Sequence, residues 1–254
     1  MLTTGGITYF SSPGGTSANP PVVLIHGAGG DHLVWPHQIR RLPGFRVFAP
    51  DLPGHGRSTG AGKQLVSAYA QDVIGWLNEV GIYQAVFVGH SMGGAVALSL
   101  ALDYPQHVAG LGLLGTGARL KVHPQIFNML ARPELVQDAL DMIVSWSYAG
   151  EIANGLRAKA IKQLSQTRPA VLHGDYLACN AFDVMERLGD IVVPALVLCG
   201  QSDRLTPPKY SHYLTEHIPN ARLEIIPDAG HMVMQEQPHL VANALLEFLA
   251  ALPH

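Results

Sequence analysis

The stretch from residue 86 to residue 102 constrains the fold of this chain more than any other part of its sequence. It begins with the apolar run Val86-Phe87-Val88, which is typical of a buried parallel strand, and ends in an Ala-, Leu- and Ser-rich run that favours a helix. Between them, Gly89-His90-Ser91-Met92-Gly93 matches G-x-S-x-G at a strand-to-helix turn. Such a turn strains the backbone of its serine and exposes the hydroxyl above the sheet, and small flanking residues leave room for the reversal. An ordinary Gly-rich turn is the alternative, but the flanking patterns favour a nucleophilic Ser91.

Strand and helix patterns alternate along most of the chain. An edge hairpin is predicted at 2–4 and 7–11, and the further strands and helices alternate after it. Strands are predicted at 22–26, 46–50, 108–114, 195–200 and 223–227, and helices at 36–42, 66–80, 95–102, 208–217 and 240–252. This alternation predicts an α/β fold with a mostly parallel, doubly wound sheet.

The segment 116–182 differs in character, because strand runs vanish and helical patterns separated by proline and glycine replace them. Ligands of open α/β folds bind at the carboxyl edge of the sheet. We therefore predict that 116–182 is a helical cap over the site, inserted into a core domain made of 1–115 and 183–254. The alternative is a satellite helical subdomain with no role in substrate binding.

Composition and charge narrow the class of partner. The net charge is −3, and no basic run is longer than Arg40-Arg41, which argues against nucleic acid and anionic membranes as partners. The N-terminus lacks a signal-peptide pattern, and no apolar run reaches the roughly 18 residues of a membrane span. Cys179 and Cys199 lie in apolar surroundings, so we expect reduced core thiols in a cytoplasmic protein. Separately, we expect a monomer or homodimer.

A serine hydroxyl needs a base that takes its proton as it attacks. Among the 13 histidines, His231 is the best candidate, because it lies on the loop after the last predicted strand. Strand geometry should turn His90 away from Ser91, and His26 is expected to brace the loop that follows. Each of these histidines ends or follows a predicted strand, but only His231 is placed to act as the base.

An acidic group should orient the imidazole and stabilise its charged form. Asp203 lies on a loop just beyond the predicted strand at 195–200 and is the candidate. Asp228 is the rival acid, but it lies so close to His231 on one tight loop that we expect it to cap a turn. The oxyanion of the intermediate needs two donors, which we assign to the backbone N–H groups of Met92 and Ala28.

Several motifs occur in an order that is specific when they are taken together: His26-Gly27-Ala28-Gly29-Gly30, Asp51-Leu52-Pro53-Gly54-His55-Gly56-Arg57-Ser58, Gly89-His90-Ser91-Met92-Gly93-Gly94, Gly200-Gln201-Ser202-Asp203 and Ala229-Gly230-His231. Together they resemble the α/β-hydrolase superfamily, in its serine branch with a helical cap, over nearly the whole chain outside the insertion. The resemblance implies a Ser91, Asp203, His231 triad in the Ser…Asp…His order of that fold. It implies a structural role, and no catalytic one, for the loop 51–58.

The identity of the nucleophile also limits which reactions are possible. The haloalkane dehalogenases and epoxide hydrolases of this superfamily carry aspartate where this chain has Ser91, which disfavours both. Few cationic residues are expected near the site, with Arg119, Lys121 and Arg204 as the exceptions, which mildly disfavours a strongly anionic substrate. We expect apolar side chains from the insertion and the catalytic loops to line the pocket: Leu33, Trp35, Phe127, Leu130, Met142, Trp146, Tyr176 and Met232. The sequence therefore predicts a carboxylesterase for small to medium, uncharged acyl groups.

Two alternatives stay open at this point. The first is an enol-lactonase or C–C bond hydrolase of aromatic degradation, and the second is a ligand receptor built on a hydrolase fold. No metal and no cofactor are predicted, because the sequence holds no H-E-x-x-H or clustered Cys/His pattern. Residues 110–115 match G-x-G-x-x-G, but they lie within a predicted strand, which is the wrong context for a dinucleotide.

Overall fold

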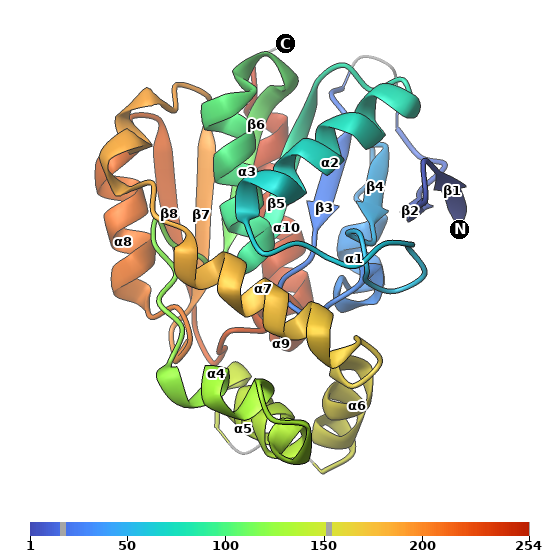
Figure 1. Ribbon diagram of the computed structural model, residues 1–254. Helices are drawn as coiled ribbons and strands as arrows, with labels where there is room; N and C mark the ends of the chain where they lie inside the picture. Colours follow the sequence, from blue (N-terminus) through green and yellow to red (C-terminus); the bar gives the residue numbers. More distant parts are fainter. Residues whose placement is uncertain (16–18, 151–153, 254) are drawn as a thin grey trace.

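The fold is built on one eight-stranded sheet in the order β1-β2-β4-β3-β5-β6-β7-β8 (Figure 1). The computed structural model describes residues 1–15, 19–150 and 154–253, so part of the predicted cap lies outside the described residues. The strands are β1 (Leu2–Thr4), β2 (Ile7–Ser11), β3 (Val22–Ile25), β4 (Val47–Pro50), β5 (Ala85–His90), β6 (Val108–Leu114), β7 (Ala195–Gly200) and β8 (Ala221–Ile226). β1, β2 and β4 pair antiparallel and the other neighbours pair parallel, which confirms the predicted α/β fold.

The central strands are apolar along their whole length because helices cover both of their faces. In β3, Val23 and Ile25 belong to one hydrophobic core, and Val22 and Leu24 belong to the other. Helices α2 (Val66–Glu79), α3 (Met92–Asp103) and α8 (Pro208–His217) pack on the first face. Helices α1 (His37–Arg40) and α10 (Pro238–Ala250) pack on the second face (Figure 1).

Residues 116–182, named the cap segment below, contain helices α4 (Pro124–Leu130), α5 (Val136–Ser147), α6 (Asn154–Leu164) and α7 (Pro169–Ala181). They lie across the end of the sheet at which the parallel strands finish (Figure 1). Buried side chains of α4, α5 and α7 form a small core of their own, which is separate from the two cores of the sheet. The proline-rich breaks in the sequence therefore separate short helices that pack on one another.

Short elements complete the chain. They are the 3₁₀ turns η1 (His32–Val34), η2 (Pro105–His107), η3 (Pro133–Leu135) and η4 (Met185–Asp190), and the helix α9 (Val233–Glu236).

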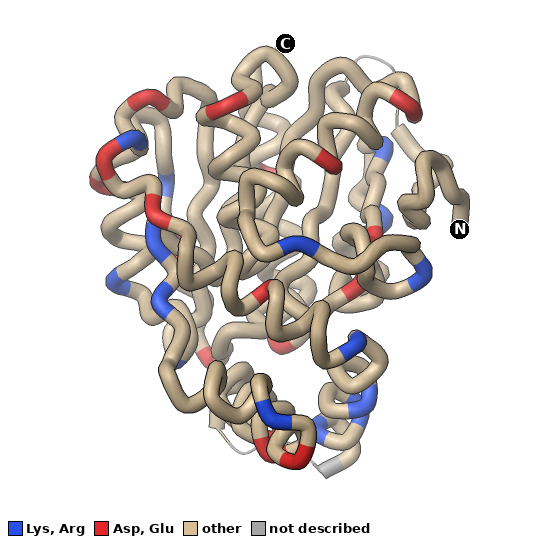
Figure 2. The backbone as a smooth tube through the Cα atoms, viewed as in Figure 1, with Lys and Arg blue, Asp and Glu red and all other residues tan. Residues whose placement is uncertain are grey.

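No helix in the described ranges combines the length and the apolar character needed to cross a membrane. Cys179 and Cys199 are buried and form no disulfide. Positively and negatively charged residues are interspersed along the backbone (Figure 2).

The register of the parallel strands brings the predicted motifs to one edge of the sheet. Ile25 pairs with Gly89, so the loop after β3 leaves the sheet beside the turn after β5. His90 pairs with Leu114 in β6, and Leu114 pairs with Leu198 in β7. The loops that follow β3, β5, β7 and β8 therefore open toward the cap segment.

Candidate active site

Ser91 occupies a sharp turn between β5 and α3. Its backbone has φ 55° and ψ −118°, a region that favours glycine and that a serine adopts only under strain. The turn is held on both sides, since Ser91 N–H donates to Leu114 O at 2.9 Å and the Thr116 hydroxyl donates to Ser91 O at 2.8 Å. The Ser91 side chain is half-buried and faces a cavity. The strained geometry thus presents the hydroxyl at the edge of the sheet.

The small residues around Ser91 are required by close backbone packing. A Cβ on Gly89 would collide with the carbonyl oxygen of Gly93, and a Cβ on Gly93 would collide with the carbonyl oxygen of Ile25. Backbone atoms cannot give way as the end of a flexible side chain can. The G-x-S-x-G spacing therefore reflects the fit of α3 against β3 and β5.

His231 and Asp203 come together on the loops after β8 and β7. His231 Nδ1 lies 2.9 Å from Asp203 Oδ2, and both side chains are buried. The Thr206 hydroxyl donates to the same carboxylate oxygen at 2.9 Å, and the Leu205 and Thr206 N–H groups donate to its other oxygen at 2.9 Å each. Burial alone would raise the pKa of Asp203, but His231 and these donors hold that pKa below its usual value. Asp203 is therefore the ionised partner that fixes the histidine.

Asp228 has a different setting. It is exposed, it has a positive φ of 53°, and it makes no side-chain hydrogen bond to His231. Aspartate and asparagine tolerate this left-handed backbone better than most residues. Its position fits a turn residue.

His90 and His26 are fully buried and support neighbouring loops. His90 Nε2–H donates to the backbone carbonyl of His231 at 2.9 Å. His26 Nδ1–H donates to Gly27 O at 2.8 Å in the loop that follows it, and His26 Nε2 accepts from Leu52 N–H at 2.9 Å in the loop 51–58. Burial lowers the pKa of His90 to about 3, with a further lowering from His231, and burial lowers the pKa of His26 to about 4. Both imidazoles are therefore neutral at neutral pH.

His90→Gln should reduce the acid sensitivity of the fold. Below the unfolded-state pKa of about 6.5 only the unfolded chain takes up this proton, so stability falls as the pH is lowered toward the folded pKa. One such histidine accounts for about 2 kcal/mol of unfolding free energy between pH 7.5 and pH 5. Glutamine keeps a donor for the His231 carbonyl and does not titrate. Urea unfolding at the two pH values should show a pH effect smaller by this amount, and an unchanged effect would contradict the assignment.

The two N–H groups assigned to the oxyanion have no acceptor among the described residues. Met92 N–H lies at the first turn of α3, and the helix supplies no acceptor there. Ala28 N–H lies in the loop after β3, and neighbouring peptide groups are held instead: Gly27 O accepts from His26 Nδ1–H at 2.8 Å and from Gly30 N–H at 3.1 Å. Ala28 lines the cavity that Ser91 faces, and Met92 directly follows Ser91 in the chain. The pair is therefore available to a negatively charged oxygen.

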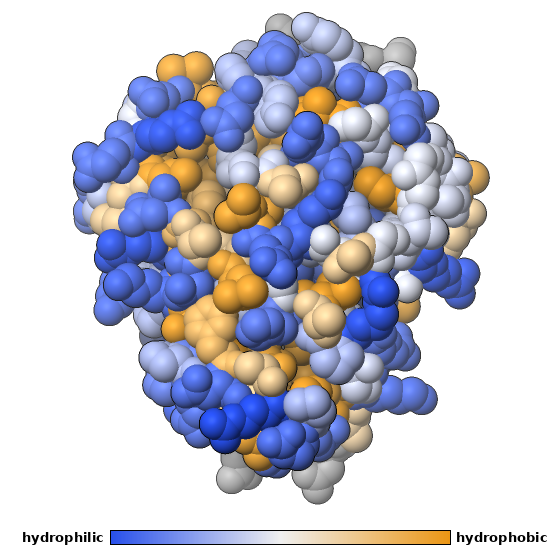
Figure 3. Space-filling view, viewed as in Figure 1, coloured by the Kyte–Doolittle hydropathy of each residue, from blue (hydrophilic) through white to orange (hydrophobic). Residues whose placement is uncertain are grey.

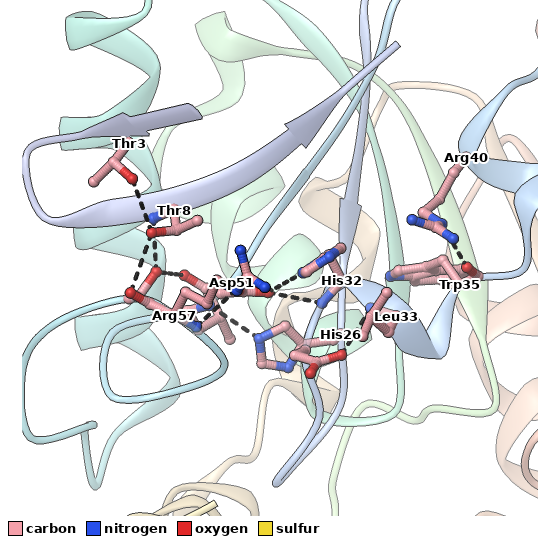
Figure 4. A network of polar contacts seen from close by, with 12 residues as sticks. Thr3, Thr8, His26, His32, Leu33, Trp35, Arg40, Asp51 and Arg57 are labelled. Atoms are coloured by element: carbon pink, nitrogen blue, oxygen red, sulfur yellow. Dashed lines mark hydrogen bonds and ion pairs between the residues drawn. The ribbon is translucent and has the colours of Figure 1, made fainter. Parts of the chain in front are cut away.

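Asp51 supports the residues that follow β3. It is fully buried, and its Oδ1 accepts from both the N–H and the ring Nδ1–H of His32 at 2.8 Å each, while its Oδ2 accepts from Arg57 N–H at 3.0 Å (Figure 4). Burial would raise the pKa of Asp51, but these bonds hold it below its usual value. The loop 51–58 thus supports the residues that follow β3 and makes no hydrogen bond to Ser91, Asp203 or His231.

A cavity of about 680 Å³ lies between the sheet edge and the cap segment, and Ser91, His231 and Ala28 form part of its wall. Most of the remaining wall is apolar and comes from the cap segment. Apolar side chains also gather on the surface where the cap segment meets the sheet domain (Figure 3). The apolar part of the wall includes Val34, Leu120, Val122, Ile126, Ile143, Val144, Trp146, Leu164, Tyr176, Leu205 and Met232, with Tyr148 and Tyr210.

Of the predicted pocket residues, Trp146, Tyr176 and Met232 line this cavity, and the others do not. Leu33 is 53% exposed on η1, whereas Trp35 is fully buried in the core below α1 and α10. Leu130 is buried in the small core of the cap segment. Phe127 and Met142 lie outside the wall, and their chain neighbours Ile126 and Ile143 line it. Successive residues of a helix point about 100° apart, so an apolar residue type does not reveal which one faces the cavity.

The sequence interpretation missed Asp175, a fully buried carboxylate of α7. It hydrogen-bonds to His55, Tyr69 and the loop that carries Ala28. A signal was present, because Asp175 lies at helical spacing with the apolar Leu172, Ala178 and Cys179 on the buried side of α7. A charged residue on an apolar stripe is a sign of a buried polar partner.

A doubly wound sheet with its serine on a strained turn between a central strand and the next helix is the arrangement of an α/β hydrolase. A sequence model described as "alpha/beta hydrolase fold" matches residues 20–238, and the chain belongs to this family.

Relatives of known activity include hydrolases of more than one kind. The chain is 28% identical to 2-hydroxy-6-oxo-6-phenylhexa-2,4-dienoate hydrolase of Burkholderia cepacia, over 90% of this chain and 87% of that protein. It is 35% identical to a thermophilic esterase of solved structure, with a TM-score of 0.83 over 98% of this chain and 96% of that one. The esterase of Thermogutta terrifontis, solved with malate bound, is 30% identical, with a TM-score of 0.85 over 96% of this chain and 93% of that one.

Proposed function

We propose that this hydrolase cleaves carboxylic esters of small to medium, uncharged acyl groups through an acyl-enzyme. The observation that supports this most strongly is the joint opening of Ser91 and the Asp203-paired His231 onto one largely apolar cavity. Its volume of about 680 Å³ lies within the range of small-molecule sites. Similarity to two solved esterases at 35% and 30% identity agrees with the proposal.

In the proposed mechanism, Ser91 Oγ attacks the ester carbonyl carbon while His231 Nε2 takes the hydroxyl proton. The carbonyl oxygen becomes an oxyanion and accepts hydrogen bonds from the Ala28 and Met92 N–H groups. When the carbon–oxygen bond to the alcohol breaks, His231 returns the proton to the departing alcohol. Water, activated by the same histidine, then attacks the acyl-enzyme and releases the carboxylic acid. Asp203 stabilises the imidazolium that forms in both halves of the reaction.

The charged residues around the cavity favour one sign of charge on the substrate. Lys121, Arg204 and Lys209 border the cavity, and no Asp or Glu belongs to the described wall. The part of the cap segment between β6 and α4, which carries Lys121, lies beside α8, since a Cβ on Gly117 would lie 2.8 Å from the Tyr210 ring. These cations are exposed, so they favour negative charge by long-range attraction and not by a tight ion pair. A charged group on the substrate should therefore be tolerated when it is negative.

A panel of p-nitrophenyl esters of increasing acyl length tests the proposal. We expect kcat/KM to be highest for acyl chains of about four to eight carbons and to fall for long chains that exceed the cavity. A pair of alkyl esters of equal length, one ending in a carboxylate and one in an ammonium group, tests the charge preference. We expect about tenfold higher kcat/KM for the carboxylate at low salt, and a smaller ratio at high salt. Absence of turnover with every ester would overturn the proposed function.

A C–C bond hydrolase is the second candidate, and the 28% identical Burkholderia cepacia relative favours it. Cleavage of a 2-hydroxy-6-oxo-dienoate by the purified protein, together with no turnover of p-nitrophenyl esters, would replace ester hydrolysis with this reaction.

A further inference from the structure

Asp175 is a buried carboxylate that the mechanism above does not use. Its Oδ2 accepts from Gly29 N–H at 2.8 Å and lies 2.7 Å from His55 Nε2, and its Oδ1 accepts from the Tyr69 hydroxyl at 2.6 Å. The carboxylate is fully buried, as is the imidazole of His55. A buried carboxylate is stable only when hydrogen bonds and opposite charge surround it, so these partners fix its position closely.

The cap segment holds Gly29 at a second point as well. The Thr167 hydroxyl, which is also buried, donates to Gly29 O at 2.9 Å. A Cβ on Gly29 would lie 2.5 to 2.6 Å from the side chains of Leu164 and Leu172, so the cap segment closes directly over this glycine. The amide of Gln163 donates to Asp31 Oδ1 at 3.2 Å on the same loop. Both polar groups of the Gly29 backbone are thus bound by residues of the cap segment.

Gly29 is the residue that follows Ala28, whose N–H is the proposed oxyanion donor. Each peptide unit is planar, so the direction of Gly29 N–H fixes the orientation of the Ala28 carbonyl. The preceding plane, which contains Ala28 N–H, is held through Gly27 O by His26 and Gly30. Gly27 and Gly29 flank Ala28, and glycine permits many backbone conformations, as the φ of 65° at Gly29 illustrates. Contacts on both sides are needed to keep Ala28 in one conformation.

We propose that Asp175 and Thr167 are positioning residues through which the cap segment holds the oxyanion donor Ala28 in place. The cap segment then has a part in stabilising the transition state, in addition to enclosing the substrate. This inference rests on the proposed function, because it takes Ala28 N–H as a donor to the oxyanion of an ester intermediate.

Four variants test the proposal, each with kcat and KM for the best ester of the panel. Asp175→Leu removes the acceptor for Gly29, while Asp175→Asn keeps one oxygen there. Thr167→Val removes the other contact with almost no change of shape. Tyr69→Phe is the matched control, since it removes a hydrogen bond to the same carboxylate and leaves Gly29 bound. Loss of one oxyanion donor lowers rates about 10²- to 10³-fold, so partial misplacement should lower kcat about 10- to 100-fold in Asp175→Leu and about 3- to 10-fold in Thr167→Val.

The measurement that separates positioning from loss of folding is the affinity of a trifluoromethyl ketone. Ser91 Oγ adds to the carbonyl carbon of this inhibitor, and its carbonyl oxygen becomes an oxyanion. We expect its inhibition constant to rise in parallel with the fall of kcat, while KM changes less than about threefold and Asp175→Asn recovers most of the loss. If Asp175→Leu does not fold, the kinetics of Thr167→Val test the proposal instead. An unchanged kcat and ketone affinity in Thr167→Val, or an equal loss in Tyr69→Phe, would overturn the inference. If the parent turns over no ester, the proposed function fails separately, and ketone affinity still reports on Ala28.

Discussion

Ser91→Ala should lower kcat for p-nitrophenyl esters on the order of 10⁶-fold, the scale seen when a hydrolase loses its nucleophilic serine. Without Oγ no acyl-enzyme forms, and the remaining amides and cavity only orient water near the ester. Ser91 sits on the strained turn and borders the cavity, so no other described serine has its setting. Steady-state kinetics measures the loss, and intact mass spectrometry after treatment with a serine-directed phosphonate should show one label on the parent and none on the variant.

Ser99 offers a matched control. It is also a serine of α3, is buried, and lies away from the turn and outside the cavity wall. Ser99→Ala should keep kcat within about twofold and should still take up the phosphonate, because such a change away from the site removes no reacting group. Labelling of the Ser91→Ala variant, or a loss of kcat below 100-fold, would contradict the assignment of the nucleophile.

Asp203→Asn is expected to lower kcat about 10⁴-fold through the tautomer of His231. The Leu205 and Thr206 N–H groups donate to Asp203 Oδ1, so the asparagine should place its oxygen there. Its NH₂ group then faces His231 Nδ1, where the carboxylate oxygen stood at 2.9 Å. Nδ1 becomes the acceptor, the ring proton moves to Nε2, and Nε2 no longer accepts the proton of Ser91. Kinetics of the ester reaction with the purified variant measures this loss.

The control is Asp228→Asn, which tests the rival acid on the His231 loop. Asparagine adopts the positive φ of this exposed position readily, so folding should be unaffected and kcat should stay within about twofold. Equal losses in the two variants would indicate a general disturbance of the loops. A loss in Asp228→Asn alone would transfer the role of the acid to Asp228.

The sheet and the loops at its edge could be predicted from the sequence because their signals are local. An apolar strand, a G-x-S-x-G turn and a helix follow one another within residues 86–102, and steric rules allow few backbones for that order. Parallel strands all finish at one edge, so the loops with Asp203 and His231 had to approach Ser91 once the sheet was assumed. The close approach of His231 Nδ1 to Asp203 needed no information beyond this topology.

The cavity wall and the buried polar contacts could not be predicted in the same way. Whether Ile126 or Phe127 faces the substrate depends on the rotation of α4, which the small core of the cap segment sets. Asp175 meets Gly29 across 146 positions of the chain, and no local pattern encodes such a contact. His90 likewise acquires its role, as donor to the His231 carbonyl, from packing between distant loops.

The cap segment is attached on the histidine side of the site too. Glu236 accepts from Gly230 N–H and from Ala149 N–H at 2.8 Å each, and Met232 N–H donates to Ser147 O at 2.9 Å. A cap segment that is hydrogen-bonded to the loops on both sides of Ser91 cannot easily be replaced as a unit, since the replacement would have to provide the same hydrogen bonds to those loops. The substrate range should therefore change more readily through single substitutions of residues that line the cavity, such as Trp146 and Tyr176, than through replacement of the cap segment. Such substitutions leave the hydrogen bonds between the cap segment and the loops in place.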